Sequence, residues 1–201
     1  MRIRTLLALS LTAGGAAACS GGEEACDPEA PGTICTIAGN GASANERGSA
    51  GDGGLAYDAR FDQVMDMAIA PNGELWILDY NTYLVRAIGP DGIIRSVVGD
   101  GSGLVGDGPP PGELVPADSV SFNHMSDMAF HDGYLYLSGF HNSRVLRVEL
   151  DTMLAENVAG DGNRLYYYGD EGPALQAALD LPSGIAFDPD GNLTIVDQAN
   201  Q

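Results

Sequence analysis

Apolar and polar positions alternate in three stretches of the chain, each broken by a tight turn. The stretches cover residues 66–79, 127–139 and 184–197, and their turns are Asn72-Gly73, Asp132-Gly133 and Asp190-Gly191. Alternation with a period of two is typical of β-strands, and Asn-Gly or Asp-Gly is a common turn between paired strands. The pattern therefore predicts three antiparallel hairpins.

In the leading strand of each predicted hairpin, a small residue lies between two large ones. The large residues are Met67 and Ile69, Met128 and Phe130, and Ile185 and Phe187, and alanine separates them at positions 68, 129 and 186. The second strands are also apolar on both faces, so we expect each sheet to be covered on both sides. The repeated alanine suits the crowded inner strand of a radial arrangement.

Further strands follow the first two hairpins. A third strand is predicted over 83–88 and 144–149, and a fourth over 93–98 and 153–159. Units of four antiparallel strands with two apolar faces are typical of β-propeller blades. A single blade cannot bury both faces by itself and must stack on its neighbours.

Glycine-rich markers repeat with a period close to the length of such a unit. Gly39, Gly99 and Gly160 are 60 and 61 positions apart. A second marker follows each of them, at Gly51–Gly54, Gly106–Pro109 and Gly169–Gly172. The spacing from this marker to the leading strand is longer in the second repeat, where a Pro-rich insertion spans 109–116 and costs little in loop entropy. Internal repetition of this kind predicts a repeat architecture.

The repeated motif resembles the NHL-repeat β-propeller family. The similarity covers residues 33–201 and rests on the order Gly-Asp-Gly-Gly, strand, turn, strand, Asp and then Asn-x-Arg-Val. Matching positions are Gly51 to Gly54, Asp79, Arg86, Asn142, Arg144, Val145 and Asp197, whereas Leu84 and Gly139 depart from the motif. Within the family, the chain is most similar to bacterial secreted proteins with long glycine-rich repeats, and more distantly to teneurin-type NHL domains.

The number of repeats predicts an all-β fold that is an open arc of about two and a half blades. Two complete blades are expected over 64–98 and 125–159, and a third begins at Ser183 and stops at the last residue. The segment Thr33–Ala38 is predicted to form an outer fourth strand. We therefore expect the sequence to be a fragment of a longer, perhaps six-bladed, propeller. Its uncovered blade faces and strand edges should make the 201-residue chain self-associate.

Charge narrows the range of partners. The chain has 28 acidic residues against 9 basic ones and a net charge of −19. Nucleic acid is an unsuitable partner, because phosphate binding requires clustered cations. Direct adsorption to an anionic membrane surface is disfavoured for the same reason, so we expect membrane contact through a lipid anchor only.

The first residues have the features of an export signal. Arg2 and Arg4 precede a short apolar stretch over 6–13, which is too short to span a bilayer, and small residues then lead to Cys19. Residues 1–18 are predicted to be a signal peptide. Its end resembles a bacterial lipoprotein signal with Cys19 acylated, residues 19–32 as a tether and 33–201 as the partial propeller. Cleavage by an ordinary signal peptidase is the alternative. Either reading predicts an exported protein of the bacterial cell envelope, as an outer-membrane lipoprotein or in secreted or periplasmic form.

The two remaining cysteines suggest a disulfide. If Cys19 carries lipid, Cys26 and Cys35 remain as a pair in an oxidising compartment. Two free thiols are the alternative. The cysteine spacing does not match a zinc site.

No constellation predicts catalysis, a cofactor or a metal. The recurring Asp52, Asp107 and Asp170 are interpreted as residues that cap loop backbone, with calcium binding as the alternative. The segment Asp188–Asn192 is interpreted as a hairpin turn. The histidines His124, His141 and His131 all fall in the second repeat and are interpreted as surface or turn residues rather than as a three-histidine metal site.

An aromatic run is the candidate ligand-binding feature. Tyr166, Tyr167 and Tyr168 interrupt the third glycine-rich loop and suit recognition of a glycan or protein, with packing over the blade as the alternative. We therefore predict a non-enzymatic binding or scaffold module for protein or glycan. The alternative is a gluconolactonase-like, metal-dependent hydrolase whose metal-binding carboxylates lie in further blades; fold alone does not decide between them.

Overall fold

The computed structural model describes residues 31, 34–42, 49–102 and 106–200. The chain divides into two compact units, residues 1–37 and 38–201. The described residues of the first unit, 31 and 34–37, form neither helix nor strand. In the described ranges, no helix is both long and apolar enough to cross a bilayer. The strands described below therefore belong to the second unit.

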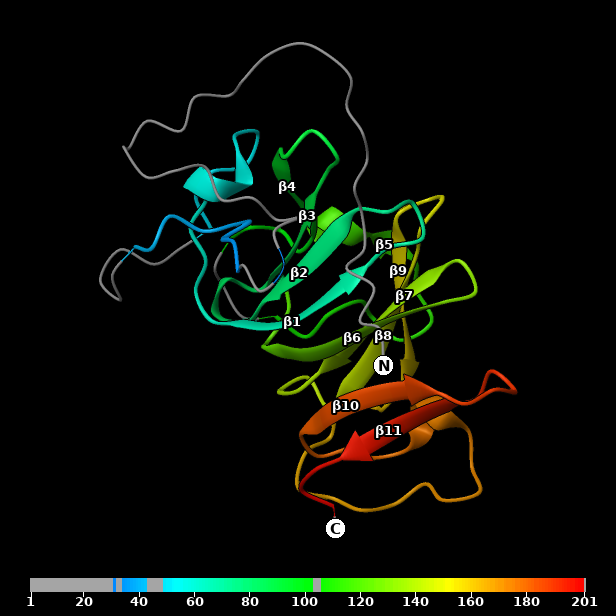
Figure 1. Ribbon diagram of the computed structural model, residues 1–201. Helices are drawn as coiled ribbons and strands as arrows, with labels where there is room; N and C mark the ends of the chain where they lie inside the picture. The colour runs from blue at the N-terminus through cyan, green and yellow to red at the C-terminus, as the bar shows by residue number, and fades with distance from the viewer. Residues whose placement is uncertain (1–30, 32–33, 43–48, 103–105, 201) are drawn as a thin grey trace, which may run out of the picture. The chain divides into compact units, whose positions relative to one another are not determined.

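The first predicted hairpin is confirmed and continues into a sheet with the order β1-β2-β3-β4 (Figure 1). Its strands are β1 (Val64–Ile69), β2 (Leu75–Asp79), β3 (Leu84–Ile88) and β4 (Ile94–Val98). Neighbouring strands are antiparallel, with Met67 opposite Ile77 and Ile77 opposite Arg86. The turn between β1 and β2 closes because Gly73 adopts a φ of +86°, which residues with a Cβ rarely adopt. This sheet is the first predicted blade.

The second blade contains the predicted strands and a short additional one. Its order is β5-β9-β8-β7-β6. The strands are β5 (Val115–Pro116), β6 (Met125–His131), β7 (Tyr134–Gly139), β8 (Arg144–Glu149) and β9 (Leu154–Ala159). The Pro-rich insertion supplies β5, which pairs antiparallel with β9 at the outer edge. Proline fits there because an edge strand does not need every N–H for a ladder.

The third blade is described as far as its leading hairpin. Strand β10 (Pro182–Phe187) pairs antiparallel with β11 (Leu193–Asp197). Short 3-10 turns lie in the connections between strands: η2 (Ala56–Asp58), η3 (Tyr80–Thr82), η4 (Ala117–Ser119) and η5 (Ala174–Gln176).

The strand predicted over Thr33–Ala38 is wrong. Residues 34–38 carry no strand, and Thr33 lies outside the described residues. A β-strand is defined by ladder hydrogen bonds to a neighbouring strand. The sheets of the described residues contain no strand from this segment. Its alternating pattern is therefore not sufficient to make it a strand.

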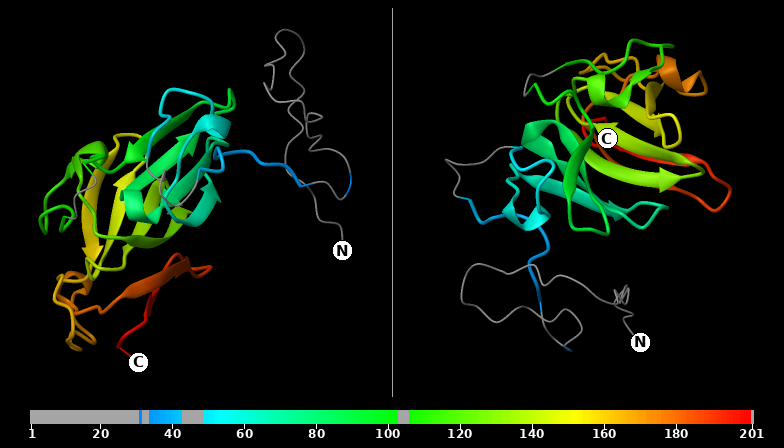
Figure 2. Two further views of the ribbon diagram at one scale, coloured as in Figure 1. Left: turned by 90° about the vertical axis from the view of Figure 1, so that its left-hand side faces the viewer. Right: turned by 90° about the horizontal axis from the view of Figure 1, so that it is seen from above.

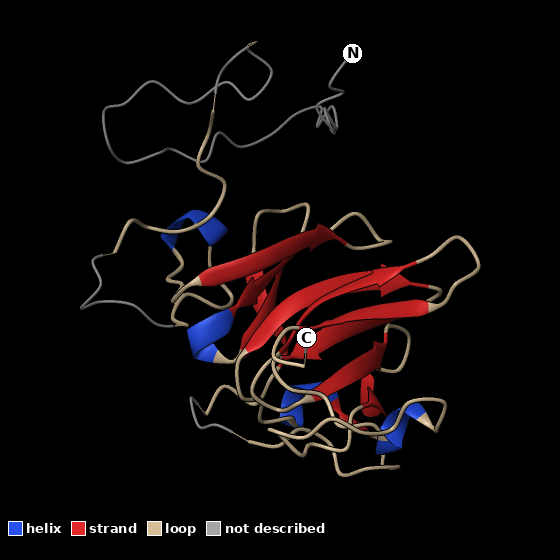
Figure 3. Ribbon diagram, turned by 90° about the horizontal axis from the view of Figure 1, so that it is seen from below, coloured by secondary structure: helices blue, strands red, loops and turns tan. Residues whose placement is uncertain are grey.

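Successive blades pack face to face, as the left view of Figure 2 shows from the side; Figure 3 shows the same strands from below. Strand β1 contacts β6, and β10 contacts both β6 and β7. Between the first two blades, the ring of Trp76 meets the edge of Phe130, with centroids 5.3 Å apart. Between the second and third, Ile185 and Leu179 pack with Val145 and Ala159. The core therefore consists of layers between blades rather than a single central cluster.

Each leading strand turns its large residues to the preceding blade and its alanine to the next. Met128 and Phe130 pack into the layer shared with the first blade, whereas Ala129 packs toward the third. In the first blade, the face that carries the large residues is uncovered, and Met67 and Ile69 are 64% and 56% exposed. In the third blade the opposite face is open at Val196, which is 57% exposed. The open arc predicted from the sequence is confirmed, and self-association of the chain stays a prediction.

Two carboxylates fasten the leading strands to one another. A bulge displaces the register of β1 before Asp66 and that of β6 before Asp127. Asp66 then accepts a hydrogen bond from the Met128 N–H at 2.9 Å, and Asp127 accepts one from the Ile185 N–H at 2.6 Å. Burial, followed by the neighbouring Asp66, raises the pKa of Asp127. These bonds set the spacing of successive blades at their inner strands.

Candidate functional site

The segment before each leading strand meets the turn after the second strand. The residues Gln63, His124 and Leu181 there have left-handed backbone, with φ of 69°, 58° and 56°. The Tyr80 N–H donates to the carbonyl of Gln63, and the Phe140 N–H to that of His124. We call this part of the arc the loop end; it comprises residues 62–63, 79–83, 123–124, 139–143, 160–181 and 197–200.

In every repeat, a side-chain oxygen accepts a backbone N–H and so joins the segment before the leading strand to the turn after the second strand. We call this junction the corner of the repeat. Asp79 Oδ1 accepts the Asp62 N–H at 2.8 Å, and Asp197 Oδ1 accepts the Asp180 N–H at 2.7 Å. In the second repeat Gly139 stands where the motif has Asp, and Asn142 Oδ1 accepts the N–H of Asn123 instead, at 2.9 Å. A Cβ at Gly139 would lie 3.0 Å from that of Asn142, so the glycine leaves room for the side chain that supplies the acceptor in place of Asp.

The corner of the second repeat brings two histidines together. His124 Nδ1 and His141 Nδ1 are 3.0 Å apart, and Asn123 Oδ1 lies 2.8 Å from His124 Nδ1. In the first repeat the corresponding side chains are Gln63 and Asn81, joined by a 3.2 Å hydrogen bond from Asn81 Nδ2. The third repeat has Leu181 and Ala199 there. The imidazole pair is therefore a feature of one blade on a shared backbone frame.

Aromatic rings from two blades surround this pair. Tyr80 and Tyr83 approach His124 with ring centroids 4.4 and 4.8 Å away, and Phe140 lies 5.0 Å from His141. Burial, and after it the neighbouring His141, lowers the pKa of His124. Burial and then the charge of Arg164 lower the pKa of His141. The surroundings of both imidazoles thus favour their neutral form.

The three histidines of the second repeat lie in two different places. His131 lies in the second blade's hairpin, where its ring stacks on Phe187 with centroids 4.0 Å apart. The side chains of His124 and His141 are only partly buried, as expected for turn residues. Their pairing was missed because 17 residues separate them. The alignment of the repeats could have revealed the pair, because it places His124 and His141 at the positions of Gln63 and Asn81. Those two polar residues belong to one corner of the first repeat.

The predicted tyrosine run also lies at the loop end and faces outward. Tyr166, Tyr167 and Tyr168 are 61%, 69% and 44% exposed. The Tyr167 hydroxyl donates to Asp170 at 2.6 Å, and that of Tyr168 to Asp161. These hydrogen bonds to carboxylates raise the pKa of both phenols. The loop is fixed to the corner of the third repeat by Asn200 Nδ2, which donates to the carbonyl of Tyr166.

The first recurring aspartate, Asp52, holds its loop onto the blade through partners that are distant in the sequence. Asp52 accepts hydrogen bonds from the buried Arg86 guanidinium and, at 2.8 Å, from the Ser96 N–H. Asp188 accepts the N–H groups of Asp190 and Asn192 in the turn between β10 and β11. Among the described residues, no group of three or more His, Cys, Asp or Glu side chains is arranged to hold a metal.

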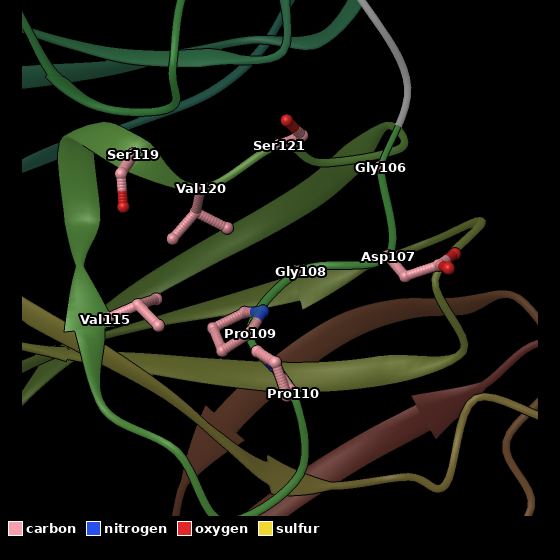
Figure 4. Close-up of a pocket in the computed structure, with 9 residues that line it drawn as sticks. All are labelled: Gly106, Asp107, Gly108, Pro109, Pro110, Val115, Ser119, Val120 and Ser121. Carbon is pink, nitrogen blue, oxygen red and sulfur yellow. The ribbon is translucent and has the colours of Figure 1, made fainter.

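A shallow hollow of about 330 Å³ lies in the inserted loop of the second repeat (Figure 4). Pro109, Val115 and Val120 turn toward one another there, whereas the carboxylate of Asp107 points away from them. The hollow is thus lined by apolar side chains together with Ser119 and Ser121, without a charged group directed into it. This gives it little selectivity for a charged ligand.

The predicted lipidation and disulfide sites fall mostly on residues that are not described. Cys19 and Cys26 lie outside the described residues, as does the predicted signal peptide. Cys35 is disulfide-bonded. Because its partner is not among the described residues, the pairing of Cys35 with Cys26 stays a prediction.

Known proteins share this fold and sequence pattern. The family profile of the Teneurin NHL domain matches residues 31–201. Teneurin-m of Drosophila melanogaster is 30% identical over 159 residues, which cover 73% of this chain and 5% of Teneurin-m. Auxiliary nutrient binding proteins from Bacteroides ovatus and Bacteroides thetaiotaomicron align with TM-scores of 0.54 and 0.53 at 13% and 12% identity. The alignments cover 71% and 72% of this chain and 36% and 37% of theirs, and at such identity they show the fold alone. Since the match covers the whole of the second unit, the chain belongs to the Teneurin NHL domain family.

Proposed function

We propose that this chain is a non-enzymatic binding or scaffold module that contacts a protein or a glycan through its loop end. The observation that carries the proposal is the exposed run Tyr166–Tyr168. The hydroxyls of Tyr167 and Tyr168 are held by hydrogen bonds to Asp170 and Asp161. Tyrosine rings supply large apolar contact area with little loss of conformational entropy, and their hydroxyls supply polar contacts. Such a surface suits a sugar ring or a protein side chain.

The fold comparisons are compatible with a binding role. Two proteins of similar fold are described as auxiliary nutrient binding proteins. The net charge of −19 disfavours nucleic acid as the partner. The ligand should therefore be neutral or cationic at its contact surface.

Tyr166→Ala is expected to weaken ligand binding about tenfold, because an aromatic contact contributes roughly 0.5–1.5 kcal/mol beyond its buried area. Its ring is exposed, and the bonds of Tyr167 and Tyr168 would remain. Ligands would be identified on a glycan microarray and on arrays of cell-envelope peptides, and affinities then measured by isothermal titration calorimetry.

The matched control is Tyr57→Ala, which removes a tyrosine of similar exposure, 57%, from the first repeat. Equal affinity of the two variants would contradict the role of the tyrosine run. A chain that binds nothing on either array would contradict the binding function.

We propose further that the protein is exported and lipid-anchored through Cys19 in the bacterial cell envelope. Arg2, Arg4, the short apolar stretch and the Ala-Ala-Ala-Cys junction support this. Stable anchoring requires two lipid signals, because a single chain gives only reversible binding. The tether over 19–32 would then place the arc away from the membrane surface.

Mass spectrometry of the mature protein should find an N-terminus at an acylated Cys19. Cys19→Ala should move the protein from the detergent phase to the aqueous phase in a phase-partition experiment. An unmodified Cys19, or a mature N-terminus elsewhere, would show that the anchor is misassigned.

A further inference from the structure

Three potential ligand atoms converge in the corner of the second repeat. His124 Nδ1 lies 3.0 Å from His141 Nδ1 and 2.8 Å from Asn123 Oδ1. The amide oxygen can only accept, so both contacts are satisfied when His124 Nδ1 carries the proton and shares it with the other two atoms. A single proton thus lies among three lone pairs. A cation can replace it there.

The backbone of these three residues is fixed by the fold. The His141 N–H donates to the carbonyl of Asn123 at 3.2 Å, and the Phe140 N–H to that of His124 at 2.9 Å. The side chain of Asn142 accepts the N–H of Asn123 and donates to the carbonyl of Gly106 at 2.7 Å. A frame of this kind holds potential ligands in place before any ion arrives.

We propose that His124, His141 and Asn123 form a binding site for a divalent transition-metal ion. Imidazole nitrogen is a good ligand for Ni²⁺, Cu²⁺ and Zn²⁺, and an amide oxygen can complete a set that leaves positions open for water or a ligand. The proposal is independent of the tyrosine run. It concerns side chains of one blade, not carboxylates in a central channel.

The distance between the two Nδ1 atoms favours metal ions whose neighbouring ligands lie at right angles to each other. With metal–nitrogen bonds of about 2.1 Å, nitrogens 3.0 Å apart subtend about 90° at the ion, less than the tetrahedral angle of zinc. Cis angles near 90° belong to the tetragonal geometries of Cu²⁺ and Ni²⁺. The soft χ2 torsions of histidine let both lone pairs turn to a common point.

The charges around the site are mixed. Arg164 is the cation whose charge acts on His141, and it is paired with Asp180 at 3.5 Å. The chain as a whole carries −19 and attracts cations.

The first repeat shows which side chains can replace the two histidines while the fold is kept. In the first repeat, Gln63 and Asn81 occupy the same corner on the same backbone. The double substitution His124→Gln/His141→Asn copies that pair into the second repeat. The matched control is His131→Gln, which removes the histidine that stacks on Phe187 in the hairpin.

The test is calorimetric titration of the untagged chain with NiCl₂, followed by electron paramagnetic resonance of its Cu²⁺ complex. The wild type and His131→Gln should bind one equivalent, and the Cu²⁺ spectrum should show two equivalent nitrogen ligands. The double variant should bind Ni²⁺ at least 10-fold more weakly and lose the nitrogen splitting, with an unchanged circular dichroism spectrum. Unchanged affinity in the double variant, an equal loss in His131→Gln, or a spectrum without nitrogen ligands would each overturn the proposal.

Discussion

Asp52→Ala should lower the free energy of unfolding by about 2–3 kcal/mol, because it leaves the buried Arg86 guanidinium without its counter-charge. The Asp52 side chain itself is 38% exposed, and solvent screening keeps the loss below that expected for a fully buried pair. The Arg86 side chain is fully buried, and its Nε donates to Asp52 Oδ1 at 3.0 Å. Without Asp52, the guanidinium keeps its bond to the carbonyl of Arg60 and its place over the Phe61 ring but loses its counter-charge. The measurement is chemical denaturation followed by circular dichroism.

Two further variants test whether the burial of Arg86 is the reason why the loss of Asp52 destabilises the protein. Glu156→Ala breaks the pair with Arg147, whose side chain is 33% exposed and can be solvated, so it should lose about 0–1 kcal/mol. Asp52→Ala/Arg86→Met removes the buried charge together with its partner and should recover part of the loss. A single Asp52→Ala variant no less stable than Glu156→Ala would contradict this account.

The Asp52 pair also predicts how stability depends on pH. Burial alone would raise the pKa of Asp52, but hydrogen bonds from Ser96 and Arg86 outweigh it and hold the pKa below its ordinary value of 3.8. A carboxyl with a lowered folded-state pKa stabilises the protein fully above its unfolded pKa, and the contribution disappears as the pH falls through the folded pKa. Asp52→Ala should therefore flatten the loss of stability below about pH 4.

Phe122→Ala should lower the free energy of unfolding by about 3–5 kcal/mol, because it empties a fully buried aromatic site. Phe122 precedes β6 and packs in the layer between the first two blades, with Leu137 and Val85. Losing it should weaken the contact between blades more than the sheets themselves. Thermal unfolding followed by calorimetry would show a broader or split transition.

The control is Phe61→Ala, at the corresponding position of the first repeat. Phe61 is only partly buried, since no described blade precedes it, and it packs against Arg86 and Ile94. Its loss should therefore destabilise less. Equal effects at the two positions would show that burial between blades is not what gives Phe122 its importance.

The strands were predictable because each repeat carries the same local signals. Alternation and Asn-Gly or Asp-Gly turns predict the hairpins to within about two residues, which is the usual uncertainty of element boundaries. The predicted third strand began at Tyr83, but Tyr83 has left-handed backbone with a φ of 58°, so β3 begins at Leu84. Strand β5 was missed because two residues that include a proline carry no periodic signal.

The candidate site was less predictable because it depends on how the corners close. Repeat alignment identifies His124 and His141 as departures from Gln63 and Asn81, but not that their Nδ1 atoms meet. Similarly, the sequence shows that Gly139 departs from the motif, but not that Asn142 supplies the missing acceptor. The exposure of the tyrosine run was predictable because it depends on no distant partner, whereas its role in ligand binding stays a prediction.

Because every leading strand points its large residues toward the preceding blade, the two end faces of the arc differ. Its face at one end presents Met67 and Ile69, whereas its face at the other presents small and polar residues together with Val196. Surfaces that differ in this way are complementary to each other rather than to themselves. A contact between two copies through these faces would therefore be heterologous, which generates rings when the rotation closes and filaments when it does not, instead of an isologous dimer.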